Sequence, residues 1–164
     1  MCIRDSRGTW ASTGCVDQQL LEAWLGDSYF SRPAPKSTGR EYFNLHWVKQ
    51  GLAARTLEPQ DVQRTLLEVT VSTISEQLLE LMPSCRQLLV CGGGVHNHFM
   101  LQRLKTMLSE VSVQSTAHYG VDPNHIESTL FAWLAGRTLN GLSGNLPAVT
   151  GASGERILGA LYPT

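Results

Sequence analysis

The chain has 164 residues, of which 42% are hydrophobic, and a formal net charge of −1. This length predicts one domain with its own core, and the near-neutral charge argues against a nucleic-acid partner or a polybasic membrane anchor. No apolar run approaches the roughly 18 residues of a membrane span, and no signal peptide is visible. The cysteines lack C-x-x-C spacing, so neither a zinc site nor a disulfide framework is predicted, and a reducing cytoplasm is the expected location.

The first segment, residues 1–8, has neither periodicity nor a cap, so we expect it to be disordered or foreign to the domain, which would span residues 9–164. A first helix should open at Ser12 or Thr13, because apolar residues then recur at helical spacing, and Gly26 can end it. Trp24 lies in that apolar stripe and is predicted to be a core residue.

A proline-rich and then polar segment, residues 32–41, follows. Thr38 and Glu41 have the spacing of a capping box, which predicts that a short amphipathic helix begins there. A loop followed by a cap explains these two residues, but it explains Lys36 and Arg40 less well. Two cations beside a helix N-terminus can hold a phosphate or a carboxylate, so both interpretations stay open.

The longest predicted helix runs from Pro59, at its first helical position, to Pro83, which ends it. Its apolar residues should mark the buried face: Val62, Leu66, Val69, Ile74, Leu78 and Leu81. Small polar residues lie among them and allow close packing against a neighbouring element. No chemistry is predicted for this helix.

An apolar run, residues 88–90, then enters three consecutive glycines, Gly92, Gly93 and Gly94, and an amphipathic stretch follows. The pattern predicts a buried central strand, a tight turn, and a helix with Asn97 as its N-cap. Glycines leave no Cβ between the backbone and an approaching ligand, and a helix N-terminus favours an anionic or nucleotide ligand. A tight turn that binds nothing explains the pattern equally well. The motif is neither a dinucleotide fingerprint nor a Walker A loop.

Residues 111–116 alternate between apolar and polar and predict a second strand. A strand, a helix and a further strand make a βαβ unit, so the two strands should be parallel and joined by a right-handed crossover. The loop at 117–124 leaves the end of the second strand. Because ligands of open α/β sheets gather beyond the carboxyl ends of the strands, the glycine turn and this loop should share that edge.

A helix should begin at Asp122-Pro123 and turn four apolar residues inward: Ile126, Leu130, Trp133 and Leu134. Glu127 lies early in it, either as an exposed carboxylate that the helix dipole favours or as a functional residue. The histidines of this region and of the glycine turn lack convincing ligand spacing, so no metal site is predicted. Residues 141–154 should form an irregular surface, and residues 157–163 a closing strand or a packed tail.

Four stretches resemble signatures of the anhydro-N-acetylmuramic acid kinases, in the same order and with the same spacing. They are residues 33–44 (PAPKSTGREYFN), 89–97 (LVCGGGVHN), 127–135 (ESTLFAWLA) and 144–153 (GNLPAVTGAS). The resemblance runs from about Trp10 to Pro163. It implies an α/β fold of the sugar kinase, heat-shock ATPase and actin superfamily, here a helix-rich C-terminal lobe with a short, mostly parallel sheet, truncated because the N-terminal lobe is absent.

Members of that family use ATP and Mg²⁺ to phosphorylate 1,6-anhydro-N-acetylmuramic acid at O6 while water opens the anhydro ring. The product is N-acetylmuramic acid 6-phosphate, an intermediate of bacterial peptidoglycan recycling and amino-sugar catabolism. The resemblance implies that the glycine turn of residues 92–94, with Asn97, contacts the adenosine of ATP. It also implies that Glu127 lies near the sugar, and it assigns no firm role to Lys36, Arg40 or the rest of their block.

The family's phosphate loops and its general-base aspartate have no match in this chain, and phosphoryl transfer depends on positioning those groups. We therefore expect the parent protein to be the kinase and this chain alone to be inactive. A non-catalytic nucleotide-binding or interaction module is the main alternative, and the block at 36–44 argues against a kinase for another sugar. An open sheet edge and exposed apolar faces would favour self-association, for instance as a homodimer.

Overall fold

The computed structural model describes residues 6–53 and 55–162, and it is rich in helices, as predicted. Its α-helices are α1 (Thr9–Ser12), α2 (Gln18–Leu25), α3 (Leu45–Leu52), α4 (Pro59–Leu81), α5 (His98–Met107), α6 (Ile126–Leu139) and α7 (Pro147–Thr150). Its strands are β1 (Gln87–Val90) and β2 (Ser112–Ser115), and its 3₁₀ helices are η2 (Ser6–Gly8), η3 (Gly92–His96) and η4 (Thr116–Tyr119). None of the helices within the described residues is long and apolar enough to cross a bilayer.

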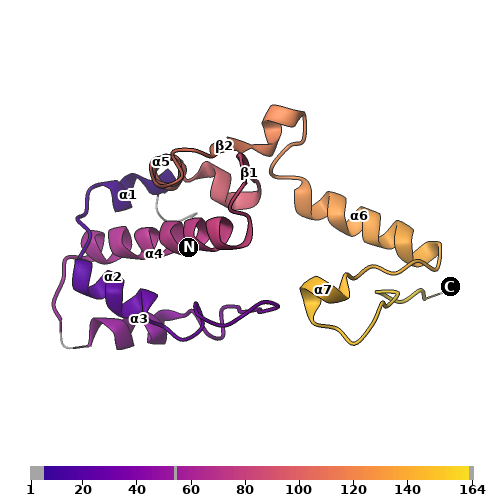
Figure 1. The fold of residues 1–164 in the computed structure, drawn as a ribbon, viewed down its shortest axis with the longest axis horizontal. Coiled ribbons are helices and arrows are strands. Elements are labelled where there is room, and N and C mark those ends of the chain that lie inside the picture. Colours follow the sequence, from indigo (N-terminus) through magenta and orange to yellow (C-terminus); the bar gives the residue numbers. More distant parts are fainter. Residues whose placement is uncertain (1–5, 54, 163–164) are drawn as a thin grey trace.

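Helix α4 is the central element. It begins at Pro59 and ends at Leu81, two residues before Pro83, so both predicted limits are confirmed. In Figure 1, α1, α5 and the two strands lie on one side of α4, and α2 and α3 lie on the other. Because α4 packs against α1, α2 and α5, it is enclosed from two sides.

The buried face of α4 differs from the predicted apolar stripe. Ile74 and Leu81 are exposed, whereas the small polar residues Thr65, Ser72 and Ser75 are almost completely buried. Helix α4 is contacted by α1 and α5 on one side and by α2 on the other. Its buried residues therefore lie on two faces rather than along a single stripe. The predicted close packing at small polar residues is confirmed.

The helices before α4 begin later than predicted. Helix α2 starts at Gln18, because the carboxylate of Asp17, rather than Ser12 or Thr13, accepts the capping hydrogen bond from the Leu20 N–H. Trp24 is buried, as predicted, and its ring stacks on the Trp47 ring with centroids 5.4 Å apart.

Helix α3 likewise begins at Leu45, after Asn44, and not at the Thr38 capping box. The Asn44 side chain accepts hydrogen bonds from the N–H groups of His46 and Trp47. The Glu41 carboxylate folds back over Gly39 instead of capping a helix. Asn44 rather than Thr38 is therefore the N-cap of this helix.

The predicted βαβ unit is confirmed: β1 and β2 pair in parallel, in the register Gln87↔Ser112 to Val90↔Ser115, and α5 connects them. The expected buried central strand is wrong. Within the described residues the sheet has two strands, so β1 is an edge strand and Leu89 remains 41% exposed.

Two hydrophobic clusters lie on either side of α4. The cluster beneath the sheet contains Ala11, Leu67, Val71, Met100, Leu104, Leu108, Val111 and Val113. The cluster beside α2 and α3 contains Leu20, Leu21, Trp24 and Val69. We call residues 6–115, which include both clusters, the body.

Residues 126–162, which we call the arm, are different. The apolar residues of α6 were expected to face inward, but Leu130 and Trp133 are about half exposed, and Figure 1 shows α6 standing apart from α4. The arm folds on itself, since the Gly144 N–H donates to the Arg156 carbonyl at 2.9 Å. The physical reason for the wrong prediction is that no element of the described chain covers the apolar side of α6.

The end of the arm corrects two further expectations. Residues 147–150 of the expected irregular segment form the short helix α7. The described residues 157–162 form no closing strand and are exposed, while Pro163 lies outside the described residues. The arm returns to the body where Gly151 lies against the Pro35 ring.

The expected disordered start, residues 1–8, falls partly outside the described residues. Ser6–Gly8 form η2, and Gly8 is buried against Asn97 and Phe99. The division into a start and a lobe at residues 9–164 stays a prediction.

Candidate functional site

The glycine turn follows directly from β1 and takes the form of the 3₁₀ helix η3. Gly92 has a φ of +67°, a conformation that favours glycine over residues with a Cβ. A Cβ built on Gly92 or Gly93 would meet no atom within 4 Å, whereas one on Gly94 would lie 3.3 Å from the Met100 side chain. The turn therefore leaves open space along its backbone at Gly92 and Gly93.

Asn97 joins this turn to α5 and is the helix N-cap, as predicted. Its side-chain Oδ1 accepts a hydrogen bond of 2.9 Å from the Met100 N–H, and its own N–H donates to the Gly94 carbonyl at 3.1 Å. The residue is 4% exposed. Its side chain thus caps α5 while its backbone N–H closes the turn, and its direct contact with a nucleotide stays a prediction.

The loop before α6 lies beside the glycine turn. The Gly92 N–H donates to the Pro123 carbonyl at 2.8 Å, and His96 Nε2 lies 2.7 Å from Asn124 Oδ1. A hydrogen bond from the Asn124 backbone, together with nearby His125, holds the pKa of Asp122 below its ordinary value. The prediction that both loops share the carboxyl edge of the parallel strands is confirmed.

Glu127 stands in the first turn of α6, where it was expected, and its side chain is exposed. It follows the loop whose Pro123 carbonyl accepts the hydrogen bond from the Gly92 N–H. The helix N-terminus favours a negative charge at this position. The structure is compatible with both interpretations of Glu127.

Lys36 and Arg40 lie in a different part of the body. In Figure 1 the loop between α2 and α3, which contains them, lies on the side of α4 away from the sheet. The Lys36 ammonium donates to the Phe30 carbonyl at 2.7 Å and lies 5.4 Å from the Tyr29 ring centre. Arg40 is exposed, and no hydrogen bond or ion pair joins it to another described residue. Lys36 therefore braces its own loop, and Arg40 is the more available cation.

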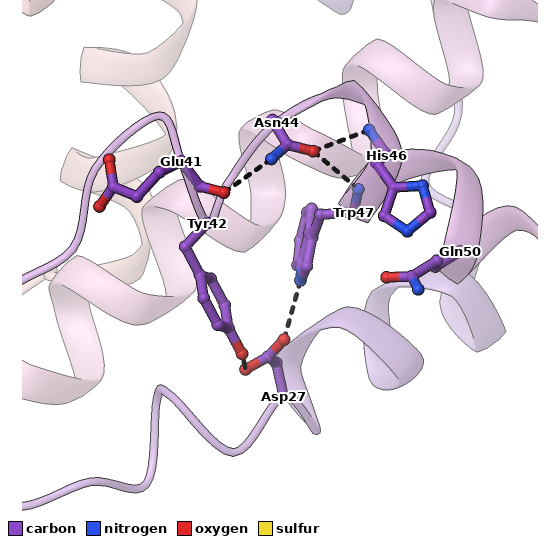
Figure 2. A pocket seen from close by; sticks show the side chains of 7 residues that line it. All are labelled: Asp27, Glu41, Tyr42, Asn44, His46, Trp47 and Gln50. Carbon is purple, nitrogen blue, oxygen red and sulfur yellow. Dashed lines mark hydrogen bonds between the residues drawn. The ribbon is translucent and has the colours of Figure 1, made fainter.

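A shallow pocket of about 260 Å³ opens beside this loop, lined by Asp27, Glu41, Tyr42, Asn44, His46, Trp47 and Gln50. In Figure 2 the side chains of Tyr42 and Trp47 point toward Asp27, whose carboxylate accepts hydrogen bonds of 2.8 Å from the Tyr42 hydroxyl and the Trp47 indole N–H. The Tyr29 backbone N–H is a third donor, also at 2.8 Å. These bonds connect α3 and the preceding loop to the end of α2.

Burial raises the pKa of Asp27, but the hydrogen bonds from the Tyr29 backbone, Trp47 and Tyr42 outweigh burial and hold the pKa below its ordinary value. The hydrogen bond between Tyr42 and Asp27 raises the pKa of Tyr42. Since Asp27, Tyr42 and Trp47 bind one another, we interpret this pocket as a structural joint, that is, a contact that holds α3 and the preceding loop against the end of α2. Sequence reasoning missed Asp27. Its side chain accepts a hydrogen bond from the backbone N–H two residues later, at Tyr29, and this is a recognisable turn pattern of Asp residues.

The described residues contain no group of three or more His, Cys, Asp or Glu side chains that could hold a metal ion. Cys15, Cys85 and Cys91 are free thiols. Among the predicted site residues, the geometry gathers the glycine turn, Asn97 and the loop before Glu127 at one edge, and it leaves Lys36 and Arg40 elsewhere.

Comparison with known proteins shows which family this chain resembles. The sequence profile described as anhydro-N-acetylmuramic acid kinase matches residues 3–164. An anhydro-N-acetylmuramic acid kinase of Xanthomonas oryzae pv. oryzae (strain MAFF 311018) is 52% identical over 159 residues, which cover 97% of this chain and 42% of that protein. One of Pseudomonas syringae pv. syringae (strain B728a) is 50% identical over 160 residues, covering 97% and 44%. The chain thus spans less than half the length of these curated relatives.

Proposed function

This chain belongs to the anhydro-N-acetylmuramic acid kinase family, and on that premise we propose that it supplies the nucleotide-binding lobe of an ATP-dependent sugar kinase. The lobe would be the C-terminal, actin-like one, because the four blocks resemble signatures of the C-terminal part of that family. The observation that carries the proposal is the match over nearly the whole chain, which includes the glycine turn.

The proposed reaction of the whole kinase converts 1,6-anhydro-N-acetylmuramic acid to N-acetylmuramic acid 6-phosphate. The γ-phosphoryl group passes from ATP to the sugar O6, the bond between C1 and O6 breaks, and a water molecule supplies the new hydroxyl at C1. ADP is the second product. In the cell this step would serve peptidoglycan recycling in the cytoplasm.

The adenosine half of ATP would lie along the backbone of Gly92 and Gly93. ATP, when bound, would supply its γ-phosphoryl group for transfer. Support comes from the open space at these two glycines and from the helix that begins one turn later, whose N-terminal N–H groups favour anionic ligands. Asn97 would act by keeping the turn in shape, since its backbone N–H binds the Gly94 carbonyl and its side chain caps α5.

Glu127 is the proposed residue near the sugar, because it follows the loop that binds Gly92 and its carboxylate is exposed. Arg40 is the better of the two proposed anion contacts, since the Lys36 ammonium already binds two backbone carbonyls. Mg²⁺ would enter with ATP. No group of described residues is suited to hold it, so we assign it no ligand in this chain.

The first experiment is a thermal shift of the purified chain with Mg-ADP. A ligand at a hundredfold excess over its Kd adds about 2.7 kcal/mol to the stability of the folded state, which for a chain of this size is a rise in Tm of roughly 5–10 °C. Gly93→Val should abolish the rise, because its side chain fills the open space without straining the turn. Gly136→Ala, at an equally open glycine on α6, should keep it.

Absence of a shift in the unmodified chain, at millimolar Mg-ADP, would contradict nucleotide binding by this lobe. Incubation with ATP and the anhydro sugar provides the second arm. We expect no sugar phosphate from the chain alone, since the phosphate loops of the family have no match in it. Sugar phosphate formed by the chain alone would refute that expectation, and the non-catalytic alternative with it.

A further inference from the structure

Glu68 is a carboxylate buried where α4 meets α5. It is 5% exposed and binds two arginines. Arg64 Nη1 donates to its Oε2 at 2.9 Å. Arg103 donates through Nη2 to Oε1 at 2.7 Å and through Nε to Oε2 at 3.2 Å. One buried carboxylate therefore accepts three hydrogen bonds from two cations.

Both arginines fix helix α5. Arg103 belongs to α5 itself and grips Glu68 with the two parallel bonds of a guanidinium fork. Arg64 lies on α4, one turn before Glu68, and its guanidinium carbon lies 4.7 Å from the ring centre of Phe99, the second residue of α5. The network thus reaches α5 both at its start and in its second turn.

A buried ion pair of this kind is weak support for overall stability, because the desolvation of three charges offsets much of their attraction. Its geometry is nevertheless specific, since a bidentate arginine–carboxylate pair sets the relative orientation of the two side chains. The apolar contacts of α5 with Leu67 and Val71 exclude water, and the arginine fork adds a directional constraint that the hydrophobic effect lacks. The network is suited to holding α5 at one rotation about its axis.

The rotation of α5 determines where the glycine turn lies. Asn97 caps α5 and also closes the turn, because its N–H donates to the Gly94 carbonyl at 3.1 Å. The two residues between Gly94 and Asn97 both belong to the 3₁₀ helix η3, so they add little freedom. A turn of the helix about its axis would therefore displace the backbone at Gly92 and Gly93.

We propose that Glu68 is a positioning residue: through Arg103 and Arg64 it holds α5, and with it the glycine turn, in the shape that receives a nucleotide. The inference rests on the proposed nucleotide site for its purpose, although the positioning itself can be measured without nucleotide. Neither arginine touches the turn, so the effect passes through the helix.

The experiment is amide hydrogen exchange of the whole chain without ligand, followed peptide by peptide, in three variants. Glu68→Gln removes the charge at constant shape. Arg103→Lys keeps the charge but loses the fork, and because Arg103 is partly exposed this variant should fold even if the first does not. Val69→Ala is the matched control, since Val69 is the next residue on α4 but is buried in the opposite cluster.

We expect exchange in the peptide covering residues 92–101 to be roughly 2- to 30-fold faster in Glu68→Gln and Arg103→Lys, the range of coupling seen for residues that act through a shared element. In Val69→Ala the peptides of α2 should change instead, and the turn should keep its protection. Arg103→Lys should have a Tm close to that of the unmodified chain, which separates positioning from stability.

Unchanged exchange at residues 92–101 in a folded Arg103→Lys would overturn the inference, as would an equal increase in Val69→Ala. Titration with Mg-ADP separates this inference from the proposed function. If the unmodified chain binds ADP and Arg103→Lys binds it equally well, the positioning role fails. If the unmodified chain does not bind ADP while the turn loosens in the variants, the nucleotide proposal fails and the positioning role stands.

Discussion

The body and the arm contain similar apolar patterns but bury them very differently. Every fully buried residue that the structure describes lies between Gly8 and Val113, whereas the arm leaves Phe131 at 71% and Leu139 at 69% exposure. Helix α6 carries apolar residues around much of its circumference, but it has no neighbouring layer. Apolar residues at helical spacing therefore predict a helix, while burial also requires a partner element.

The largest expected difference between the two regions comes from one substitution made in each. Leu104→Ala, at a position 1% exposed beneath the sheet, should cost about 2–5 kcal/mol of the free energy of unfolding, because it removes buried methyl groups and leaves a cavity. Leu130→Ala, on α6 and half exposed, should change it by less than about 0.5 kcal/mol. Urea denaturation followed by circular dichroism measures both.

A loss in Leu130→Ala as large as that in Leu104→Ala would mean that the arm is packed in solution, either on the body or on a second copy. Repeating the measurement at several protein concentrations distinguishes these cases, because only association makes the midpoint depend on concentration.

A second contrast concerns pH and compares two aspartates. The folded pKa of Asp27 in the body lies below its unfolded value, so the stabilisation that it provides is complete above about pH 4 and is lost as the pH falls through the folded pKa. Asp27→Asn should weaken the body by about 1–2 kcal/mol at neutral pH, because three donors lose a charged acceptor. The variant should also lose less stability in acid than the unmodified chain does.

Asp122, next to the arm, also has a lowered pKa, but it is exposed and its hydrogen bonds stay within its own loop. Asp122→Asn should therefore shift the midpoint of global unfolding less than Asp27→Asn does, at neutral and at acid pH. Acid titrations of both variants, followed by tryptophan fluorescence, test the pair. Equal acid sensitivity of Asp27→Asn and the unmodified chain would show that Asp27 is not the group that titrates.

The elements that sequence reasoning located well are those whose limits depend on local chemistry. Pro59 begins α4 and Asn97 caps α5, because a fixed φ and a short polar side chain act within one turn. The parallel pairing of β1 and β2 followed from the length of the connecting helix. The glycine turn could be predicted for the same reason, since its geometry is contained in three consecutive residues.

Features that depend on distant partners could not be predicted. Ser12 and Asp17 are both acceptable caps, and the choice falls on Asp17 because its N–H also donates to Thr65 and its carboxylate binds Arg55. Asp27 meets Trp47 across 20 residues, and Glu68 meets Arg103 across 35. Sequence periodicity does not predict contacts between residues so far apart, so both the hydrogen bonds of Asp27 and the charge network of Glu68 were missed.

The smallest expected effect lies at the glycine turn, where the body meets the loop that leads to the arm. Gly92 has a positive φ and its N–H binds Pro123, so Gly92→Ala should cost about 1 kcal/mol, the penalty of a Cβ in the left-handed region. Gly93 lacks that conformation and has open space around it, so Gly93→Ala should change the free energy of unfolding by less than about 0.5 kcal/mol. Chemical denaturation of the two variants measures the difference. Equal costs would mean that the backbone of Gly92 relaxes in solution, and the link between Gly92 and Pro123 would then no longer fix how the arm leaves the body.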